Sequence, residues 1–294
     1  MNNTIASSKK INKAALPNLI IIGATKCGTT SLHYYLNLHP EISMSSTKEI
    51  DFFVAEKNWN RGIEWYKSQF SGSTKIRGEA SPKYTACHRW QGVASRLHSI
   101  VPEAKLIYIL RDPIERIISH YMHRKVLGKE HGTIDEALTR CGLSNSDYLV
   151  RSKYYLQLKE YLNYFPPQQI LILTLEELSS YPQATLKKVF RYLEVDDSFE
   201  TPLTNKKLYQ TQNRIAQNSW GFFVSKMPLI NDVMPLLPDR LQRQIAKLLG
   251  NPFSQQMGRP QLNPKLRQQI IDLLREDMAC LRDYTVKDFQ EWCV

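Results

Sequence analysis

Residues 19–32 read Leu-Ile-Ile-Ile-Gly-Ala-Thr-Lys-Cys-Gly-Thr-Thr-Ser-Leu. The four apolar residues predict a strand at 19–22 that is buried on both faces, as in a parallel sheet covered by helices. The hydroxyl residues open a helix that we expect at 29–37. Gly23 and Gly28 permit unusual dihedral angles in the turn between them. A buried strand, a glycine-flanked turn and a helix N-terminus point backbone N–H groups at one spot, so this segment is predicted to bind a phosphate.

The loop differs at one position from the nucleoside-triphosphate pattern G-x-x-x-x-G-K-[ST]. The spacing of the glycines matches, but Thr29 stands at the lysine position and the lysine is Lys26, before the second glycine. The acidic residue best placed for Mg²⁺ at the end of an apolar strand is Asp112, which follows Arg111. A magnesium-dependent P-loop kinase of a small molecule is therefore the alternative function. An ordinary strand–turn–helix with a capping threonine is the alternative without a ligand.

The rest of the chain continues the same alternation of apolar runs and helical patterns. Strands are expected at 105–110 and 169–173, and helices at 113–126, 146–164, 181–193 and 264–282. This alternation is typical of an α/β fold, here a P-loop-like, three-layer arrangement with a central, mainly parallel sheet flanked by helices. We expect a flexible basic tail over residues 1–16 and a single domain over residues 17–294. A variable helical insertion is expected at about 201–257.

Composition limits the class of partner and the cellular setting. The net charge is +11, from 39 basic and 28 acidic residues, which implies an anionic partner. The basic residues are dispersed and form no dense run, which favours a small anionic molecule over nucleic acid. Five scattered cysteines, with no C-x-x-C pair, predict neither a metal site nor a disulfide framework. No apolar stretch is long enough to cross a membrane or to form a signal-peptide core, so we expect a cytoplasmic protein without integral membrane association.

A second segment, residues 105–121, reads Lys-Leu-Ile-Tyr-Ile-Leu-Arg-Asp-Pro-Ile-Glu-Arg-Ile-Ile-Ser-His-Tyr. With the lysine-shifted loop, it resembles the donor-binding segments of sulfotransferases that use 3′-phosphoadenosine 5′-phosphosulfate (PAPS). Residues 48–53 (Lys-Glu-Ile-Asp-Phe-Phe), residues 62–66 (Gly-Ile-Glu-Trp-Tyr) and residues 78–84 (Gly-Glu-Ala-Ser-Pro-Lys-Tyr) are similar to blocks of the heparan-sulfate-type and related bacterial branch. The resemblance implies a bacterial enzyme that transfers a sulfuryl group from PAPS to a hydroxyl or amine, with a saccharide or glycoconjugate as the leading acceptor.

The resemblance also implies roles for individual residues. Lys26 would stabilise the leaving phosphate of the donor, Glu49 would be the general base, and Arg111 with Ser119 would hold the 3′-phosphate. No metal is required, because the cations of the protein balance the charge. The other implied donor-site residues are Cys27, Gly28, Thr29, Thr30, Ser31, Gly258, Arg259 and Tyr154, of which Tyr154 is equally consistent with a core position. The implied acceptor-site residues are Lys48, Asp51 and Glu79. Glu79 is the second candidate for the base after Glu49, and it is better suited to orienting the acceptor or a loop.

Three positions depart from the family pattern. Asp51 stands where family members often have histidine, and Ala80 stands where several polysaccharide-modifying members have lysine. Met257 replaces the lysine of a K-G-R closing loop. The first two departures lie in the blocks expected to meet the acceptor, so the resemblance defines the donor more closely than the acceptor.

Overall fold

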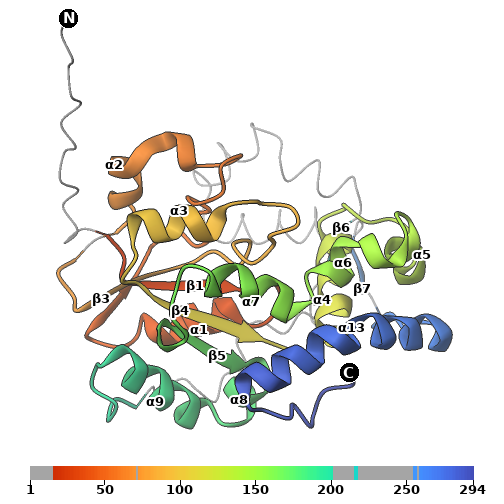
Figure 1. Cartoon of the computed structure of the whole chain (residues 1–294). Helices are drawn as coiled ribbons and strands as arrows, with labels where there is room; N and C mark the ends of the chain where they lie inside the picture. The colour runs from red at the N-terminus through yellow and green to blue at the C-terminus, as the bar shows by residue number, and fades with distance from the viewer. Residues whose placement is uncertain (1–15, 71, 201–214, 218–253, 257) are drawn as a thin grey trace, which may run out of the picture. The chain divides into compact units, whose positions relative to one another are not determined.

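The computed structural model describes residues 16–70, 72–200, 215–217, 254–256 and 258–294 (Figure 1). The chain divides into two compact units. The first comprises residues 1–24, 28–109 and 158–204, and the second comprises residues 25–27, 110–157 and 205–294. The expected basic tail and most of the expected insertion at 201–257 lie outside the described residues, so the predicted domain organisation stays a prediction.

The first unit is built on a five-stranded sheet in the order β2-β3-β1-β4-β5. Its strands are β1 (Leu19–Gly23), β2 (Ile42–Met44), β3 (Ile76–Ala80), β4 (Lys105–Leu110) and β5 (Ile170–Thr174). β1 pairs in parallel with both β3 and β4, and β2 pairs in parallel with β3. The side chains of Leu19, Ile20, Ile21 and Ile22 are all completely buried. This burial confirms the strand predicted from the apolar run.

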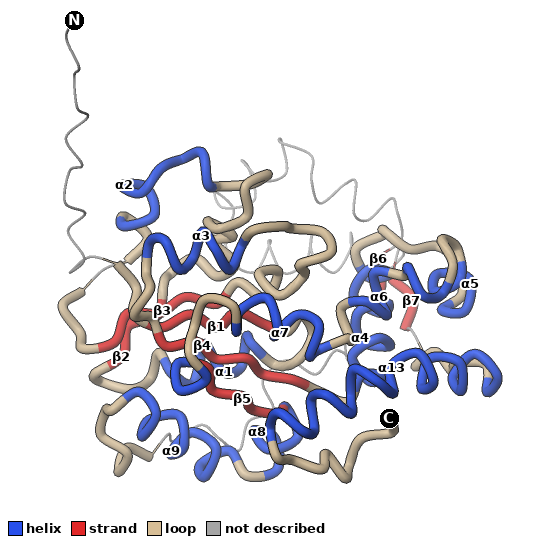
Figure 2. Tube along the Cα trace, in the orientation of Figure 1, coloured by secondary structure: helices blue, strands red, loops and turns tan. Residues whose placement is uncertain are grey.

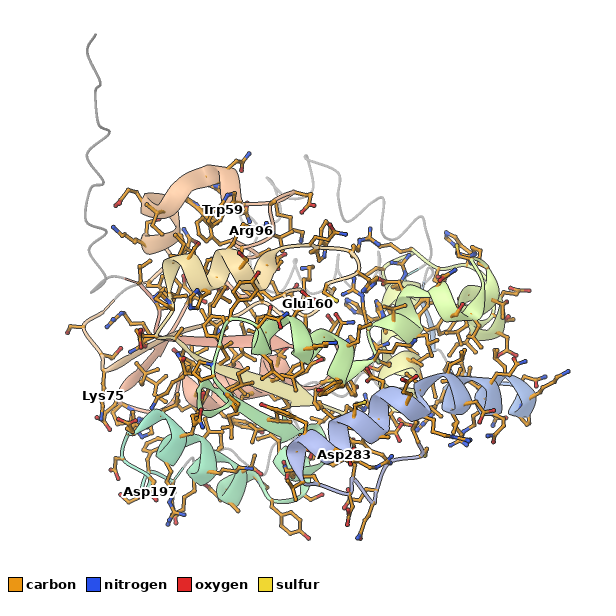
Figure 3. All side chains as sticks on the ribbon, viewed as in Figure 1. Trp59, Lys75, Arg96, Glu160, Asp197 and Asp283 are labelled. Carbon is orange, nitrogen blue, oxygen red and sulfur yellow. The ribbon has the colours of Figure 1, made fainter. Side chains whose placement is uncertain are left out.

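Helices flank this sheet, as Figure 2 shows for α3 and α9 on opposite sides of the strands. The helices of the first unit are α1 (Thr29–Leu36), α2 (Gly62–Lys67), α3 (Val93–Ile100), α8 (Leu175–Ser180) and α9 (Pro182–Leu193). α3 also supports the loop that follows β2: Arg96 Nε donates a hydrogen bond of 2.8 Å to the Phe53 carbonyl, and its guanidinium lies 5.9 Å from the Trp59 ring (Figure 3). The predicted α/β class with a central, mainly parallel sheet is confirmed.

The described residues of the second unit are mainly helical. It contains α4 (Pro113–Val126), α5 (Ile134–Thr139), α6 (Asp147–Val150) and α13 (Pro264–Thr285), with a two-stranded antiparallel sheet of β6 (Ile215–Gln217) and β7 (Ser254–Gln256). α4 has the predicted bounds because its local signals are strong. Pro113 occupies the first turn, and the Asp112 carboxylate accepts the Glu115 N–H at 2.8 Å. No described helix is both long enough and apolar enough to cross a membrane.

The single helix predicted at 146–164 is wrong. The chain forms α6, leaves the helix at residues 151–153 and starts again as α7 (Tyr154–Leu162). The Asp277 carboxylate of α13 accepts the N–H groups of Tyr155 at 3.0 Å and Leu156 at 2.8 Å. This cap stabilises a new helix start and comes from a residue more than a hundred positions away. The helical periodicity of residues 146–164 therefore gives no indication of it.

Candidate active site

The loop from β1 to α1 is shaped by two glycines. A Cβ atom on Gly23 would lie 2.1 Å from Thr85 Oγ1, and one on Gly28 would lie 2.6 Å from Leu175 Cδ1. Gly28 also has a φ of +89°, and Lys26 adopts a left-handed backbone conformation with a φ of +72°. α1 starts directly after Gly28 without a side-chain cap. A helix start that lacks a side-chain cap suits an anion, so the loop fits the phosphate predicted for it.

Cys27 and Tyr154 lie inside the second unit beside the backbone of Arg111. Both side chains are completely buried, with Cys27 Sγ 3.6 Å from Tyr154 Oη. The Tyr154 hydroxyl donates a hydrogen bond of 2.7 Å to the Arg111 carbonyl, and its ring lies 5.9 Å from that of Trp292. The burial of the ring favours the core position that the sequence left open for Tyr154. Its hydroxyl still holds the backbone of a predicted donor-site residue.

Two guanidinium groups predicted to lie in the donor site meet at one carboxylate on α4. Arg111 Nη2 lies 3.2 Å from Glu115 Oε2, and Arg259 Nη2 donates to Glu115 Oε1. Ser119 is buried four residues after Glu115, and residues four apart share a face of a helix. Gly258 lies exposed beside Arg259. The second unit thus gathers Arg111, Arg259 and Ser119 at one face of α4, although Arg259 lies 144 positions after Glu115 in the sequence.

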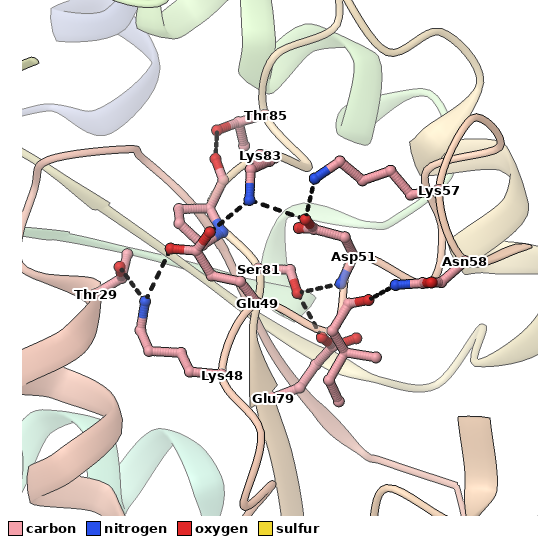
Figure 4. Close-up of polar contacts among 12 residues, drawn as sticks. Thr29, Lys48, Glu49, Asp51, Lys57, Asn58, Glu79, Ser81, Lys83 and Thr85 are labelled. Atoms are coloured by element: carbon pink, nitrogen blue, oxygen red, sulfur yellow. Dashed lines mark hydrogen bonds and ion pairs between the residues drawn. The ribbon is translucent and has the colours of Figure 1, made fainter. Parts of the chain in front are cut away.

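In the first unit, Glu49 lies close to the start of α1 (Figure 4). Lys48 Nζ is 3.6 Å from Glu49 Oε1 and 3.5 Å from the hydroxyl of Thr29, the first residue of α1. Lys83 Nζ is 2.5 Å from the other oxygen, Glu49 Oε2. Burial raises the pKa of Glu49, but the Lys83 and Lys48 ammonium groups outweigh burial and hold this pKa below its ordinary value. Glu49 is therefore a carboxylate at neutral pH, the form that a general base requires.

Asp51 is the buried neighbour of Glu49. Its Oδ2 accepts hydrogen bonds from Lys57 Nζ at 2.5 Å and Lys83 Nζ at 2.9 Å, and its N–H donates to Ser81 Oγ at 3.1 Å. Its Oδ1 is buried and accepts no hydrogen bond from the described residues. The φ angles of Glu49 and Asp51 are +60° and +51°. Left-handed non-glycine residues persist where the surroundings impose them, and such residues concentrate at functional sites.

Glu79 lies beneath this loop and is completely buried on β3. It accepts hydrogen bonds from the hydroxyls of Tyr66 at 2.6 Å, Ser81 at 2.7 Å and Tyr84 at 3.0 Å. Burial raises its pKa to about 7, although all three hydroxyl donors act in the opposite direction. Ser81 also accepts the Asp51 N–H. These contacts connect Glu79 to the loop, and its role in the site stays a prediction.

Two residues of this arrangement were not predicted, Lys83 and Lys57. Lys83 lies inside the block 78–84 that carried the resemblance, but at a position where the family pattern accepts any residue. Lys57 belongs to none of the matched blocks. Lys83 could have been suspected from its position, because it lies two residues after Ser81 in a block that also contains Glu79.

Similarity to known proteins indicates one family. Residues 16–225 match the family model described as "Sulfotransferase domain". Human heparan sulfate glucosamine 3-O-sulfotransferase 5 is 33% identical over 191 residues, which cover 60% of this chain and 53% of the relative. Human bifunctional heparan sulfate N-deacetylase/N-sulfotransferase 2 is 30% identical over 218 residues, which cover 67% of this chain and 24% of the relative. The chain thus spans between about a quarter and about half of the length of these relatives.

One solved structure resembles almost the whole chain. A sulfotransferase from Alicyclobacillus acidocaldarius superposes with a TM-score of 0.66 and 23% sequence identity, and the match covers 94% of this chain and 98% of that one. This likeness confirms the predicted fold.

Proposed function

Because the chain belongs to the sulfotransferase domain family, we propose that it transfers a sulfuryl group from PAPS to a hydroxyl or amine of a saccharide or glycoconjugate. The names of the relatives support the saccharide class, since both act on heparan sulfate. The observation that carries the proposal is the position of Glu49, which Lys48 connects to Thr29 at the start of α1. A carboxylate held beside a helix N-terminus that suits a phosphate is well placed to act as the general base in group transfer.

In the proposed step, Glu49 takes the proton from the acceptor hydroxyl or amine. The acceptor atom forms a bond to sulfur while the bond from sulfur to the phosphate oxygen of PAPS breaks. The bonding electrons stay on that oxygen, and 3′-phosphoadenosine 5′-phosphate (PAP) leaves. Lys26 and the N–H groups at the start of α1 would stabilise the developing charge, which is typically worth about 10²- to 10³-fold in rate for one such donor. Base catalysis by Glu49 would add roughly 10²- to 10⁴-fold.

Arg111, Arg259 and Ser119 would recognise the 3′-phosphate. The Glu115 carboxylate, which both guanidinium groups contact, holds them at one place on α4. Guanidinium groups bind phosphate strongly through paired hydrogen bonds. We assign no metal to the step, because these cations and the helix start balance the charge of the donor.

Calorimetric titration with PAP tests the donor site. The wild type and the variants Lys26→Ala and Arg111→Ala are compared, each with and without Mg²⁺, with ATP as the competing nucleotide. Arg275→Ala is the matched control, because Arg275 is an exposed arginine of α13. We expect metal-independent binding of PAP that Arg111→Ala weakens by more than about tenfold and Arg275→Ala leaves unchanged. Magnesium-dependent binding of ATP without binding of PAP would instead establish the kinase alternative.

Transfer from ³⁵S-labelled PAPS to a panel of saccharides tests the reaction itself. The panel includes N-deacetylated and N-acetylated heparosan, so that amine and hydroxyl acceptors are distinguished. Glu49→Gln should reduce turnover by roughly 10²- to 10⁴-fold while the affinity for PAP is retained. Undiminished turnover in Glu49→Gln would remove Glu49 as the base.

A further inference from the structure

Lys83 lies between the two carboxylates of the loop that follows β2. Its ammonium nitrogen is 2.5 Å from Glu49 Oε2 and 2.9 Å from Asp51 Oδ2 (Figure 4). Asp51 and Ala80 are the two departures from the family pattern in the acceptor blocks. The structure places the Asp51 carboxylate beside the ammonium group of Lys83, which lies three residues after Ala80.

The backbone around Lys83 is fixed from below. The Tyr84 N–H donates to the Ser81 carbonyl at 3.0 Å, which closes a turn around Pro82 and Lys83. The Tyr84 hydroxyl is anchored on the buried Glu79. The Lys83 side chain rises from this turn toward Glu49 and is about one third exposed, so its position depends on the carboxylates that it contacts.

Asp51 is fixed more firmly than Lys83. Its side chain is 5% exposed, its N–H is bound to Ser81, and Lys57 donates to the same oxygen that accepts from Lys83. Lys57 alone would neutralise the Asp51 charge in a simple ion pair. The second ammonium makes Asp51 a bridge between two lysines, and this bridge holds Lys83 at Glu49.

We propose that Lys83 is the positioning residue for Glu49 and that Asp51, held by Lys57, positions Lys83. The proposal rests on the proposed role of Glu49 as the base. Lys83 occupies Oε2, which leaves Oε1, contacted among the described residues by Lys48 at 3.6 Å, as the oxygen that receives the acceptor proton. Lys83 keeps its own proton throughout, because the Glu49 and Asp51 carboxylates both favour its charged form.

Removal of either partner should shift the pKa of Glu49, in opposite directions. Without Lys83, Glu49 loses its nearest cation, so the pKa of Glu49 rises. In Asp51→Asn the amide oxygen still accepts a hydrogen bond from Lys83 and keeps it at Glu49, while the negative charge that shared the ammonium is gone, so the pKa of Glu49 falls. The other charged or titratable groups facing this arrangement are Lys48 on the same loop, Lys57, His33 on α1 beside Lys48, and Glu79 beneath Ser81. All four remain in both variants, but Lys57 loses its carboxylate partner in Asp51→Asn, and its positive charge then also lowers the pKa of Glu49.

A titration of Glu49 by carbon-detected NMR measures this effect without donor or acceptor. Protein labelled at the glutamate carboxyl carbon is titrated as wild type, Lys83→Met and Asp51→Asn, and Glu49→Gln assigns the resonance. We expect the pKa of Glu49 to rise by about one unit in Lys83→Met and to fall in Asp51→Asn. Lys67→Met, which removes a lysine paired with exposed Glu64 on α2, should change nothing. Unchanged values, or shifts of the same sign in both variants, would overturn the proposal.

Turnover with the saccharide found by the ³⁵S assay provides the second measurement. Lys83→Met should lower kcat by on the order of 10²-fold with little change in KM for PAPS, and Lys83→Arg should retain most of the rate. The acid limb of the pH–rate profile should move up in Lys83→Met and down in Asp51→Asn. Equal losses in Lys83→Met and Lys83→Arg, without movement of the acid limb, would show a merely structural role.

These two measurements separate failure of this proposal from failure of the proposed function. If the pKa of Glu49 shifts as expected but Glu49→Gln keeps full turnover, the ion-pair arrangement is correct and Glu49 is not the base. If Glu49→Gln loses turnover but the pKa does not respond to Lys83, Glu49 is the base and Lys83 does not position it. PAP affinity, measured by calorimetry, confirms in each variant that the fold is intact.

Discussion

Replacement of Glu79 by glutamine should change how the stability of the protein depends on pH. The Glu79 carboxyl is completely buried and is surrounded by the hydroxyls of Tyr66, Ser81 and Tyr84. Burial raises its pKa from the ordinary 4.5 to about 7, because the charged form loses its hydration. The folded protein therefore holds a proton on Glu79 over a pH range in which the unfolded chain has released it.

The size and sign of the effect follow from linkage. Between the two pKa values the folded state binds one more proton than the unfolded state, so the free energy of unfolding falls as the pH rises. The stabilising contribution of protonated Glu79 is fully present below its pKa in the unfolded chain, and it is lost as the pH rises through its pKa of about 7 in the folded protein. The shift corresponds to roughly 3 kcal/mol, at about 1.4 kcal/mol per pKa unit. Glutamine at position 79 does not titrate, so the variant lacks this loss.

Chemical denaturation at a series of pH values from about 5 to about 8 tests this prediction. The difference in unfolding free energy between wild type and Glu79→Gln should change by roughly 3 kcal/mol across the range, with wild type losing more as the pH rises. Glu64→Gln on the exposed surface of α2 is the control, and its difference from wild type should stay constant. A constant difference for Glu79→Gln would refute the reasoning and show that the three hydroxyl donors keep Glu79 ionised in the folded protein.

Three further substitutions test the loop, a helix start and the donor site. In denaturation experiments, Gly28→Ala should lower the free energy of unfolding by about 1–3 kcal/mol more than Gly62→Ala. Both glycines have positive φ, but only a Cβ at position 28 would press against Leu175. Equal losses would show that the backbone conformation alone matters. Asp277→Ala should destabilise the protein by about 1–2 kcal/mol, since it removes the cap at the start of α7; an unchanged melting temperature contradicts this. Ser119→Ala should weaken PAP binding in calorimetry by about tenfold, consistent with the loss of one hydrogen bond to a charged group. A larger loss of affinity than in Arg111→Ala would contradict the expectation that Arg111 contributes more than Ser119.

Part of the fold and site was predictable because the signals are local. The apolar run of β1, the two glycines of the loop and the hydroxyl residues that open α1 are adjacent in the chain, and each acts through its own backbone or its immediate neighbours. α4 was predicted at its observed bounds for the same reason, since Asp112 and Pro113 define its start within one turn. The family and the candidate residues Lys26, Glu49 and Arg111 followed from motifs of this kind.

The short strands were not predicted, because their residues acquire strand structure only by pairing. β3 contains Arg77, Gly78 and Glu79, an unpromising composition for a buried strand, yet it pairs with both β1 and β2. The start of α7 likewise depends on Asp277, which lies 122 positions from Tyr155. Pairing and capping partners at such separations leave no periodic pattern in the segment that they shape.

The sequence by itself thus determined the glycine-flanked loop, the helices α4, α9 and α13, and the family, because these depend on residues close together in the chain. Only the tertiary structure decided the environment of those residues. It buried Glu79, placed Lys83 between Glu49 and Asp51 from 34 and 32 positions away, and brought Arg259 to Glu115 from 144 positions away. Ion pairs and burial depend on distances in space, and these distances are set by strand order and packing.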